Sequence, residues 1–137
     1  MTMHKVLIAG EWRAARATAS FKSFNPALGE ELPGEYPISS WADCDAALEA
    51  AVKAAEALRA LPAEPRAAFL EAFAKRIEAR KDELVETAHA ETGLPRAPRL
   101  GEVELPRTTG QLRQGAAAAR DGSWAMPTID TKLNIRS

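Results

Sequence analysis

Proline and glycine fix where helices can run in this chain of 137 residues, because proline interrupts helical hydrogen bonding and glycine loosens the backbone. The stretch FKSFNPALGEELPGEYPISSW, residues 21–41, is too rich in both to be helical and too apolar for a disordered tail. After residue 40 the character changes, and apolar side chains recur with helical periodicity. We therefore predict one α/β domain with β segments at both ends and a mostly helical middle.

The first 39 residues are predicted to form an extended β strap that starts with a hairpin. Val6–Ile8 and Glu11–Arg13 are typical strands, and Ala9-Gly10 between them is a tight turn. Phe21–Phe24 can form a further strand. Leu32–Ile38 contains two prolines, which cannot donate to a β ladder, so we expect it at a sheet edge or in a covering strap.

The first predicted helix begins near residue 40 and ends at Leu61-Pro62. A serine or aspartate can cap its N-terminus, because the side-chain oxygen accepts from a backbone N–H group. The candidate caps are Ser39, Ser40 and Asp43. The apolar positions define one face, which consists of Leu48, Val52, Ala55 and Leu58 or Arg59.

The second predicted helix begins at Glu64-Pro65, with proline in the first turn, where its missing N–H has little effect. Apolar side chains four residues apart form a stripe on this helix. The stripe consists of Phe69, Phe73 and Ile77, and we expect it to lie in the core.

Two more helices are predicted before the chain returns to β structure. The third runs from Asp82 to a stop at Gly93. The fourth occupies residues 96–121, and Pro106 is expected to kink or break it. Gly122 is the expected end of this helix.

The last segment, PTIDTKLNIRS, alternates strictly between apolar and polar residues and predicts one long strand. The β segments have no obvious partners within the chain, and an unpaired amphipathic strand invites association. We therefore expect residues 127–136 to pair with the remainder of a longer polypeptide or with another subunit. Residues 123–137 are assigned to this β element, and residues 40–122 to the helical part.

Composition excludes several classes of protein. The formal net charge is −1, which argues against a nucleic-acid-binding surface. No apolar run reaches the roughly 20 residues that span a bilayer, and the N-terminus does not resemble a signal peptide. One cysteine fits a reducing compartment, so we expect a cytoplasmic protein.

The residues themselves predict no catalytic, cofactor-binding or metal site. Cys44 lies between two aspartates, whose charges oppose thiolate formation. His4 and His89 are too few and too distant to form a metal-ligand pattern with it; for His89 a hydrogen-bonded surface or interface role is expected. Gly110 and Gly115 have the spacing of a phosphate-binding loop but lack its following Lys-Ser/Thr and lie in a helical segment.

Several motifs, in order, resemble the N-terminal part of the aldehyde dehydrogenase superfamily. The opening matches at Gly10-Glu11-Trp12 and at Asn25 to Glu30, and ELVETAHAETGLP (Glu83 to Pro95) resembles the family's stretch ending in Glu-Thr-Gly-x-Pro. RTTGQLR (Arg107 to Arg113) and TIDTKLNIRS (Thr128 to Ser137) look most like the 2-oxoglutarate semialdehyde (2,5-dioxopentanoate) dehydrogenases. The resemblance covers nearly the whole chain.

This resemblance implies the N-terminal portion of an aldehyde-dehydrogenase-like fold, whose first segment straps a cofactor-binding domain and whose final strand begins a bridging, oligomerisation element. Members of the family oxidise an aldehyde with NAD or NADP, using a cysteine, a glutamate and an asparagine. All three residues, and the cofactor-binding segments, lie beyond the equivalent of Ser137, and Cys44 matches none of them. The resemblance therefore implies no catalytic residue here, an inactive chain when alone, and a homo-oligomeric complete enzyme.

One further site is implied by resemblance. Some members bind a structural monovalent cation at positions that match Ser23, Phe24 and Glu91, and oxygen ligands suit a hard cation. The alternative is that Glu91 merely ends a helix. Pro98 and Pro106 depart from the family pattern within the helix after Gly93.

Three functions therefore remain open. The chain is the N-terminal part of an aldehyde dehydrogenase, or a non-catalytic assembly module that retains only this region, or a helical partner protein that resembles the family by accident. Nucleotide-dependent activity of a longer polypeptide would indicate the first. Self-association without dinucleotide binding would indicate the second, and a compact helical monomer would indicate the third.

Overall fold

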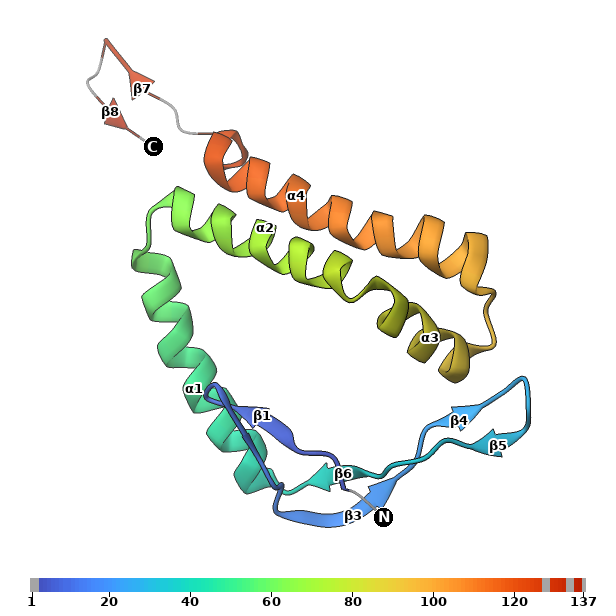
Figure 1. Cartoon of the computed structure of the whole chain (residues 1–137). Coiled ribbons are helices and arrows are strands. Elements are labelled where there is room, and N and C mark those ends of the chain that lie inside the picture. The colour runs from blue at the N-terminus through green and yellow to red at the C-terminus, as the bar shows by residue number, and fades with distance from the viewer. Residues whose placement is uncertain (1–2, 127–128, 133–134, 137) are drawn as a thin grey trace.

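The computed structural model of this protein describes residues 3–126, 129–132 and 135–136. N-terminal strands, the long helix α1 and a group of helices α2–α4 form three sides of an open frame (Figure 1). The strands are β1 (Val6–Ile8), β2 (Glu11–Arg13), β3 (Ala17–Phe21), β4 (Phe24–Asn25), β5 (Glu30–Glu31), β6 (Tyr36–Ser39), β7 (Ile129–Asp130) and β8 (Ile135–Arg136). The helices are α1 (Trp41–Ala60), α2 (Ala63–Ala79), α3 (Lys81–Thr92), α4 (Leu105–Asp121) and the 3-10 turn η2 (Ser123–Ala125). The segment η1 (Arg96–Glu104) precedes α4 and is kinked at Ala97, whose backbone is extended, so the fourth helical segment is not continuous from residue 96 as predicted.

The predicted hairpin at the N-terminus is confirmed. β1 and β2 are antiparallel, with Val6 opposite Arg13 and Ile8 opposite Glu11. Ala9 and Gly10 both have positive φ, 53° and 84°, which is the geometry of a type I′ turn. Glycine adopts this conformation readily, whereas Ala9 adopts it at a steric cost.

The strap continues through two further antiparallel pairs. β3 pairs with β6, and Pro37 lies opposite Ser20 in this ladder. β4 pairs with β5. The predicted strand over Phe21–Phe24 is divided between the end of β3 and the start of β4, and only the last part of Leu32–Ile38 belongs to β6.

The expectation that the β segments lack partners within the chain is wrong for the strands that the structure describes. Each of them pairs with one other strand, and the result is four separate two-stranded sheets. Tight turns allow the chain to fold back on itself at each of these places. Two-stranded sheets nevertheless have two unpaired edges each, so their outer N–H and C=O groups remain available to further strands.

The expectation of one long C-terminal strand is also wrong. β7 and β8 form a hairpin, with Ile129 opposite Arg136 and Asp130 opposite Ile135, across a turn at residues 131–132. Alternation has the same appearance in a strand and in a hairpin, and it did not reveal the turn. Residues 127, 128, 133, 134 and 137 of the predicted strand lie outside the described residues.

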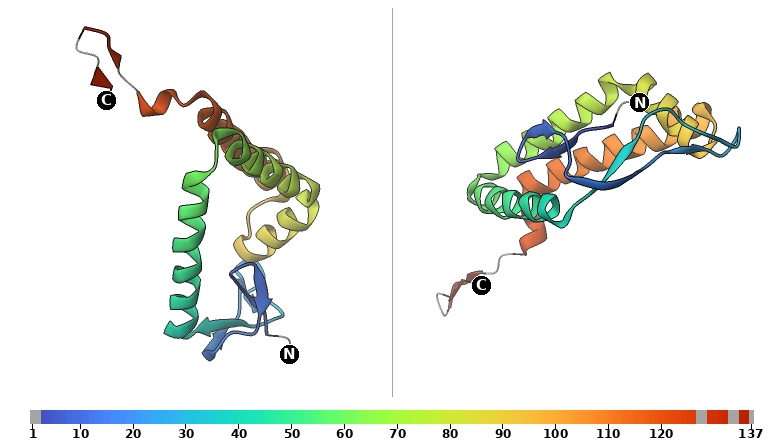
Figure 2. Two further views of the ribbon diagram at one scale, coloured as in Figure 1. Left: turned by 90° about the vertical axis from the view of Figure 1, so that its left-hand side faces the viewer. Right: turned by 90° about the horizontal axis from the view of Figure 1, so that it is seen from below.

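Helices α2 and α4 pack side by side in opposite directions (Figures 1 and 2). Small side chains line their contact: Ala67 and Ala74 of α2 and Ala116 of α4 have no exposed surface, and Thr109 is nearly buried. The pairs 67/74 and 109/116 are each seven residues apart, about two helical turns, and so share a face. Small residues at this spacing allow the two backbones to approach closely.

The prediction that the apolar stripe of α2 lies in the core is wrong. Phe69 is 64% exposed and Phe73 49% exposed, and Ile77 is only half-buried. The helix instead turns its alanine face to α4, so the aromatic side chains point elsewhere. Apolar periodicity identified a helix but not which face packs within this chain.

Helix α1 ends before Leu61-Pro62, as predicted, and Ser40 precedes it without a side-chain capping hydrogen bond. Its apolar face is exposed: Leu48 and Val52 are each 61% exposed. In Figure 2, α1 extends away from the α2–α4 pair. Of its residues, only Asp43 is buried.

The predicted stops at Gly93 and Gly122 are confirmed, since both are left-handed residues that terminate α3 and α4. Pro106 does not break the fourth helical segment. Glu104 and Leu105 keep helical angles, and the hydrogen-bond pattern changes there from η1 to α4. Across the described residues, no helix combines the length and apolarity needed to cross a membrane.

Candidate functional site

The strap meets helix α3 at a junction between residues far apart in sequence. The Ser23 hydroxyl donates a hydrogen bond of 2.8 Å to Glu91 Oε1. The Ser23 carbonyl in turn accepts from the Leu32 N–H at 2.8 Å. The junction therefore fastens the open end of the β4–β5 hairpin to the C-terminal end of α3.

An asparagine turn shapes the strap at this junction. Asn25 Oδ1 accepts from the backbone N–H groups of Ala27 at 3.0 Å and Leu28 at 3.2 Å. The turn brings Pro26 against Gly93, where a Cβ would lie 3.5 Å from Pro26 Cγ. Gly93 has φ 71°, so this position both ends α3 and admits the strap closely. The Asn-Pro stretch that is too broken for a helix is thus a tight turn laid against α3.

This junction brings together two of the three residues matched to the cation site. Ser23 and Glu91 are hydrogen-bonded, and Phe24 is the next residue, in β4. Within the described part of the chain, no group of three or more His, Cys, Asp or Glu side chains could hold a metal ion. The hydroxyl–carboxylate contact fastens two elements, and a cation at these oxygens remains a prediction.

The other candidates do not come together as a catalytic site. Cys44 is half-buried in the first turn of α1, and its N–H donates to Ser40 O. His4 stacks on Tyr36 with ring centroids 4.4 Å apart. His89 Nδ1 lies 2.6 Å from Leu94 O, so this nitrogen carries the proton and donates. Each group has a different neighbour, and no nucleophile–base pair forms among them.

Asp43 is a buried residue whose role the sequence did not reveal. It is 2% exposed and lies at the start of α1 beside the hairpin. Its carboxylate accepts from the Arg16 backbone N–H at 2.6 Å, from Arg16 Nε at 3.0 Å and from Arg13 Nη2 at 3.4 Å. The backbone hydrogen bond, helped by the two guanidinium groups, lowers the pKa of Asp43 against the opposing effect of burial. Asp43 therefore ties α1 to the strap as a carboxylate.

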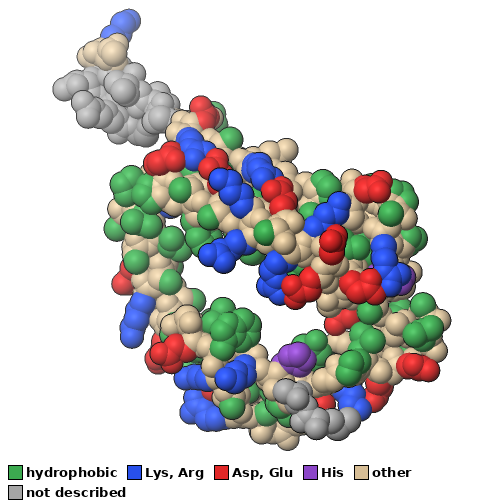
Figure 3. Space-filling view, viewed as in Figure 1, with side chains coloured by type: hydrophobic (Ala, Val, Ile, Leu, Met, Phe, Trp, Pro, Cys, Tyr) green, Lys and Arg blue, Asp and Glu red, His purple; other side chains and the backbone are tan. Residues whose placement is uncertain are grey.

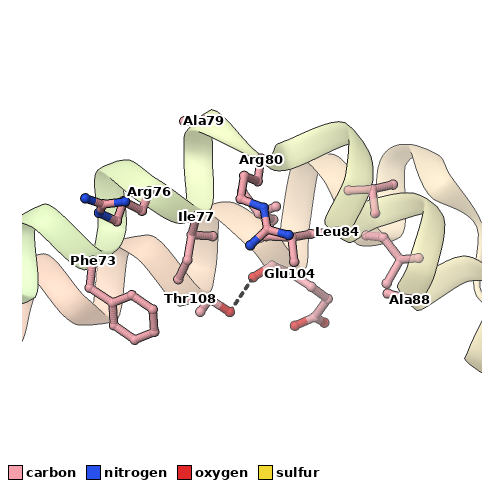
Figure 4. A pocket seen from close by; sticks show the side chains of 12 residues that line it. Phe73, Arg76, Ile77, Ala79, Arg80, Leu84, Ala88, Glu104 and Thr108 are labelled. Carbon is pink, nitrogen blue, oxygen red and sulfur yellow. Dashed lines mark hydrogen bonds between the residues drawn. The ribbon is translucent and has the colours of Figure 1, made fainter. Parts of the chain in front are cut away.

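A cleft of about 650 Å³ opens between α2, α3 and the η1–α4 junction (Figure 4). Most of its lining is apolar and comes from α2, α3, η1 and α4. The large apolar side chains in it are Phe73, Ile77, Leu84, Val85, Leu100 and Leu105. Sequence reasoning missed the cleft because its walls are distant along the chain, although Phe73 and Ile77 belong to the stripe noted on α2.

Charged groups at the cleft differ in how they are paired. Arg80 donates hydrogen bonds from Nε and Nη2 to the Glu83 carboxylate. These hydrogen bonds lower the pKa of Glu83. Glu104 pairs with Arg99 at 2.7 Å. Arg76 also lines the cleft, and among residues 3–126, 129–132 and 135–136 it has no ionic partner.

Comparison with protein families gives a match over most of the chain. The model of the aldehyde dehydrogenase family matches residues 12–135. The chain is 42% identical over 132 residues to alpha-ketoglutaric semialdehyde dehydrogenase 2 of Azospirillum brasilense. This alignment covers 96% of this chain and 25% of the relative. It is 38% identical over 96 residues to glutarate-semialdehyde dehydrogenase of Pseudomonas putida, or 70% of this chain and 20% of the relative.

A solved structure is similar in fold as well. The NAD-dependent benzaldehyde dehydrogenase of Corynebacterium glutamicum superimposes with a TM-score of 0.77 at 29% identity, over 85% of this chain and 25% of that one. The chain thus spans about a quarter of the length of the Azospirillum and Corynebacterium proteins. These similarities confirm the predicted N-terminal portion of the fold.

Proposed function

Because this chain belongs to the aldehyde dehydrogenase family, we propose that it forms the N-terminal part of an enzyme that oxidises an aldehyde to a carboxylate with NAD or NADP. One observation carries the proposal: the family match runs over residues 12–135, while the chain spans only a quarter of a relative's length. A complete enzyme of this kind would have about three quarters of its length outside these residues.

The catalytic residues of that enzyme are proposed to lie beyond Ser137. The described residues support this, since neither His4 nor His89 pairs with Cys44, which lies beside the buried carboxylate of Asp43. NAD or NADP is likewise expected to bind elsewhere. Gly110 and Gly115 fall inside α4, so their backbone N–H groups cannot cradle a phosphate as a glycine-rich loop would.

We propose an aldehyde that carries a carboxylate at its other end, with 2-oxoglutarate semialdehyde as the first candidate. The support is the 42% identity to a relative named for that compound, together with the relative named for glutarate semialdehyde. Both named compounds are acids with one aldehyde group. The alternative retained from the sequence, a non-catalytic assembly module, would give no turnover of any of them.

The strap, helical part and terminal β element are proposed to occupy residues 1–39, 40–122 and 123–137, as the sequence predicted. The open edges of the β7–β8 hairpin support pairing of residues 127–136 with the rest of the polypeptide or with another subunit of a homo-oligomer. The single cysteine supports a cytoplasmic location, and the net charge of −1 supports a partner other than nucleic acid.

The test begins with the intact mass of the purified, denatured protein. A mass several times 14.8 kDa is expected, followed by aldehyde-dependent formation of NADH or NADPH. The panel contains 2-oxoglutarate, glutarate, succinate and malonate semialdehydes, with uncharged aldehydes of matching length as controls. The 137-residue chain alone is expected to be inactive. Activity of the short chain that disappears in Cys44→Ala would overturn the proposal.

A further inference from the structure

The cleft between α2, α3 and the η1–α4 junction exposes apolar side chains that proteins usually bury. Its walls are largely apolar, yet Phe73 is 49% exposed and Leu84 36% exposed. An apolar concavity of this kind on a chain with few buried large side chains is typical of a place where another segment packs. Figure 4 shows Phe73, Ile77 and Leu84 directed toward the same space.

Charge at the rim specifies what the covering segment carries. Arg80 and Glu104 are already paired with Glu83 and Arg99. Arg76 lines the same cleft and has no ionic partner in the described part of the chain. An arginine on the edge of an apolar surface that becomes covered is stabilised by a carboxylate, because covering it alone would remove its hydration. The complementary segment is therefore apolar with an acidic group.

We propose that this cleft is covered by an apolar segment of the same polypeptide from beyond residue 137, and that a carboxylate of that segment pairs with Arg76. The inference rests on the proposed function, which supplies the longer polypeptide: the chain spans 25% of the length of its Azospirillum relative. A segment in the same polypeptide has a high effective concentration at the cleft, which a separate partner lacks.

The experiment measures thiol labelling of the complete polypeptide. Ala88→Cys places a small thiol on α3 in the cleft lining, and Thr87→Cys places one on the same helix outside it. Labelling is followed peptide by peptide by mass spectrometry, in buffer and in urea. We expect Ala88→Cys to react at least about tenfold more slowly in buffer than in urea, and Thr87→Cys to change much less.

A charge reversal tests the acidic partner. Arg76→Glu is expected to raise the labelling of Ala88→Cys at least about threefold, because local opening becomes easier. Lys75→Glu makes the same change of charge one residue away, outside the cleft lining, and is the matched control.

The outcomes separate this inference from the proposed function. Equal labelling of Ala88→Cys in buffer and urea, in an active enzyme of full mass, would overturn the covered cleft and leave the function standing. Protection that disappears on dilution would assign the cleft to a second copy and overturn the inference. Protection unaffected by Arg76→Glu would overturn the carboxylate partner. A mass of 14.8 kDa would remove the proposed function and the inference together.

Discussion

Helix α1 and the α2–α4 pair are built from alanine-rich helices of similar length, yet they are held in opposite ways. α1 has 20 residues and buries only Asp43, at its first turn. α2 and α4 have 17 residues each and press fully buried small side chains against one another. The difference indicates that helix formation and helix packing are encoded separately. Alanine favours helix formation, whereas the packing of α2 on α4 uses small residues repeated on one face.

Ion pairs strengthen the same contrast. Arg120 of α4 donates to Glu64 and to Glu71 of α2, at distances of 2.7 to 2.8 Å. Arg113 makes a two-nitrogen contact with Glu78 at 2.6 and 2.8 Å. Among the described residues, the ion pairs of α1 are those of Asp43 with Arg13 and Arg16 of the strap, and Arg16 also donates to the Ala42 carbonyl. Figure 3 shows the opening that separates α1 from the other helices.

The largest effect is expected where the two helices touch. Ala74→Leu adds bulk to a side chain with no exposed surface, so we expect the free energy of unfolding to fall by about 1–3 kcal/mol. The matched substitution Ala51→Leu on the exposed surface of α1 should change it by less than about 0.5 kcal/mol. Urea unfolding of both variants of this chain, followed by circular dichroism, measures the difference. Equal losses would refute the contrast.

Acid is expected to loosen the α2–α4 pair through Arg120. Its hydrogen bonds lower the pKa values of Glu64 and Glu71 from 4.5. A carboxyl group with a lowered pKa stabilises the fold above its unfolded value and loses that contribution as pH falls through its folded value. Stability should therefore decline below about pH 4.5.

The variant Arg120→Gln isolates this contribution. It should be less stable than the parent near neutral pH, and its stability should fall less steeply with acid, because its two glutamates titrate nearer their ordinary pKa. Arg59→Gln on α1 is the control, since Arg59 forms no ion pair within the described residues. Melting temperatures across the acid range give the slopes. Parallel curves for parent and Arg120→Gln would contradict the assignment.

A smaller effect is expected at the helix ends. α4 ends at Gly122 with φ 68°, whereas α1 ends at Leu61 in an extended conformation. Gly122→Ala has space for its methyl group but must adopt the left-handed region, so we expect a loss of about 1 kcal/mol. Leu61→Ala requires no unusual backbone angle and should cost less. A neutral Gly122→Ala in urea unfolding would show that the end of α4 relaxes.

Sequence reasoning succeeded where the cause was local. The turn at Ala9-Gly10 and the stops at Gly93 and Gly122 follow from backbone angles that few residues adopt. It failed where the cause was a distant element. Phe69 was expected in the core, but which face of α2 is buried depends on where α4 lies.

The site shows the same limit. Ser23 and Glu91 were brought together only by resemblance to a family, because they are 68 residues apart and no local pattern joins them. Asp43 is paired with two arginines of the strap, and the cleft is formed by α2, α3, η1 and α4. The hairpin β7–β8 was missed because alternation does not distinguish one strand from two.

The smallest expected effect gives the sharpest comparison. Leu48→Ala removes an apolar side chain that is 61% exposed on α1, so the unfolding free energy of this chain should change by less than about 0.5 kcal/mol. If the proposed longer polypeptide covers α1, the same substitution should destabilise the complete protein by about 2 kcal/mol or more, as burial of a leucine implies. Glu49→Ala, at the neighbouring exposed position, is the control in both. A loss in the short chain would mean that α1 is already packed there, and indifference in both would mean that α1 stands in solvent even in the complete protein.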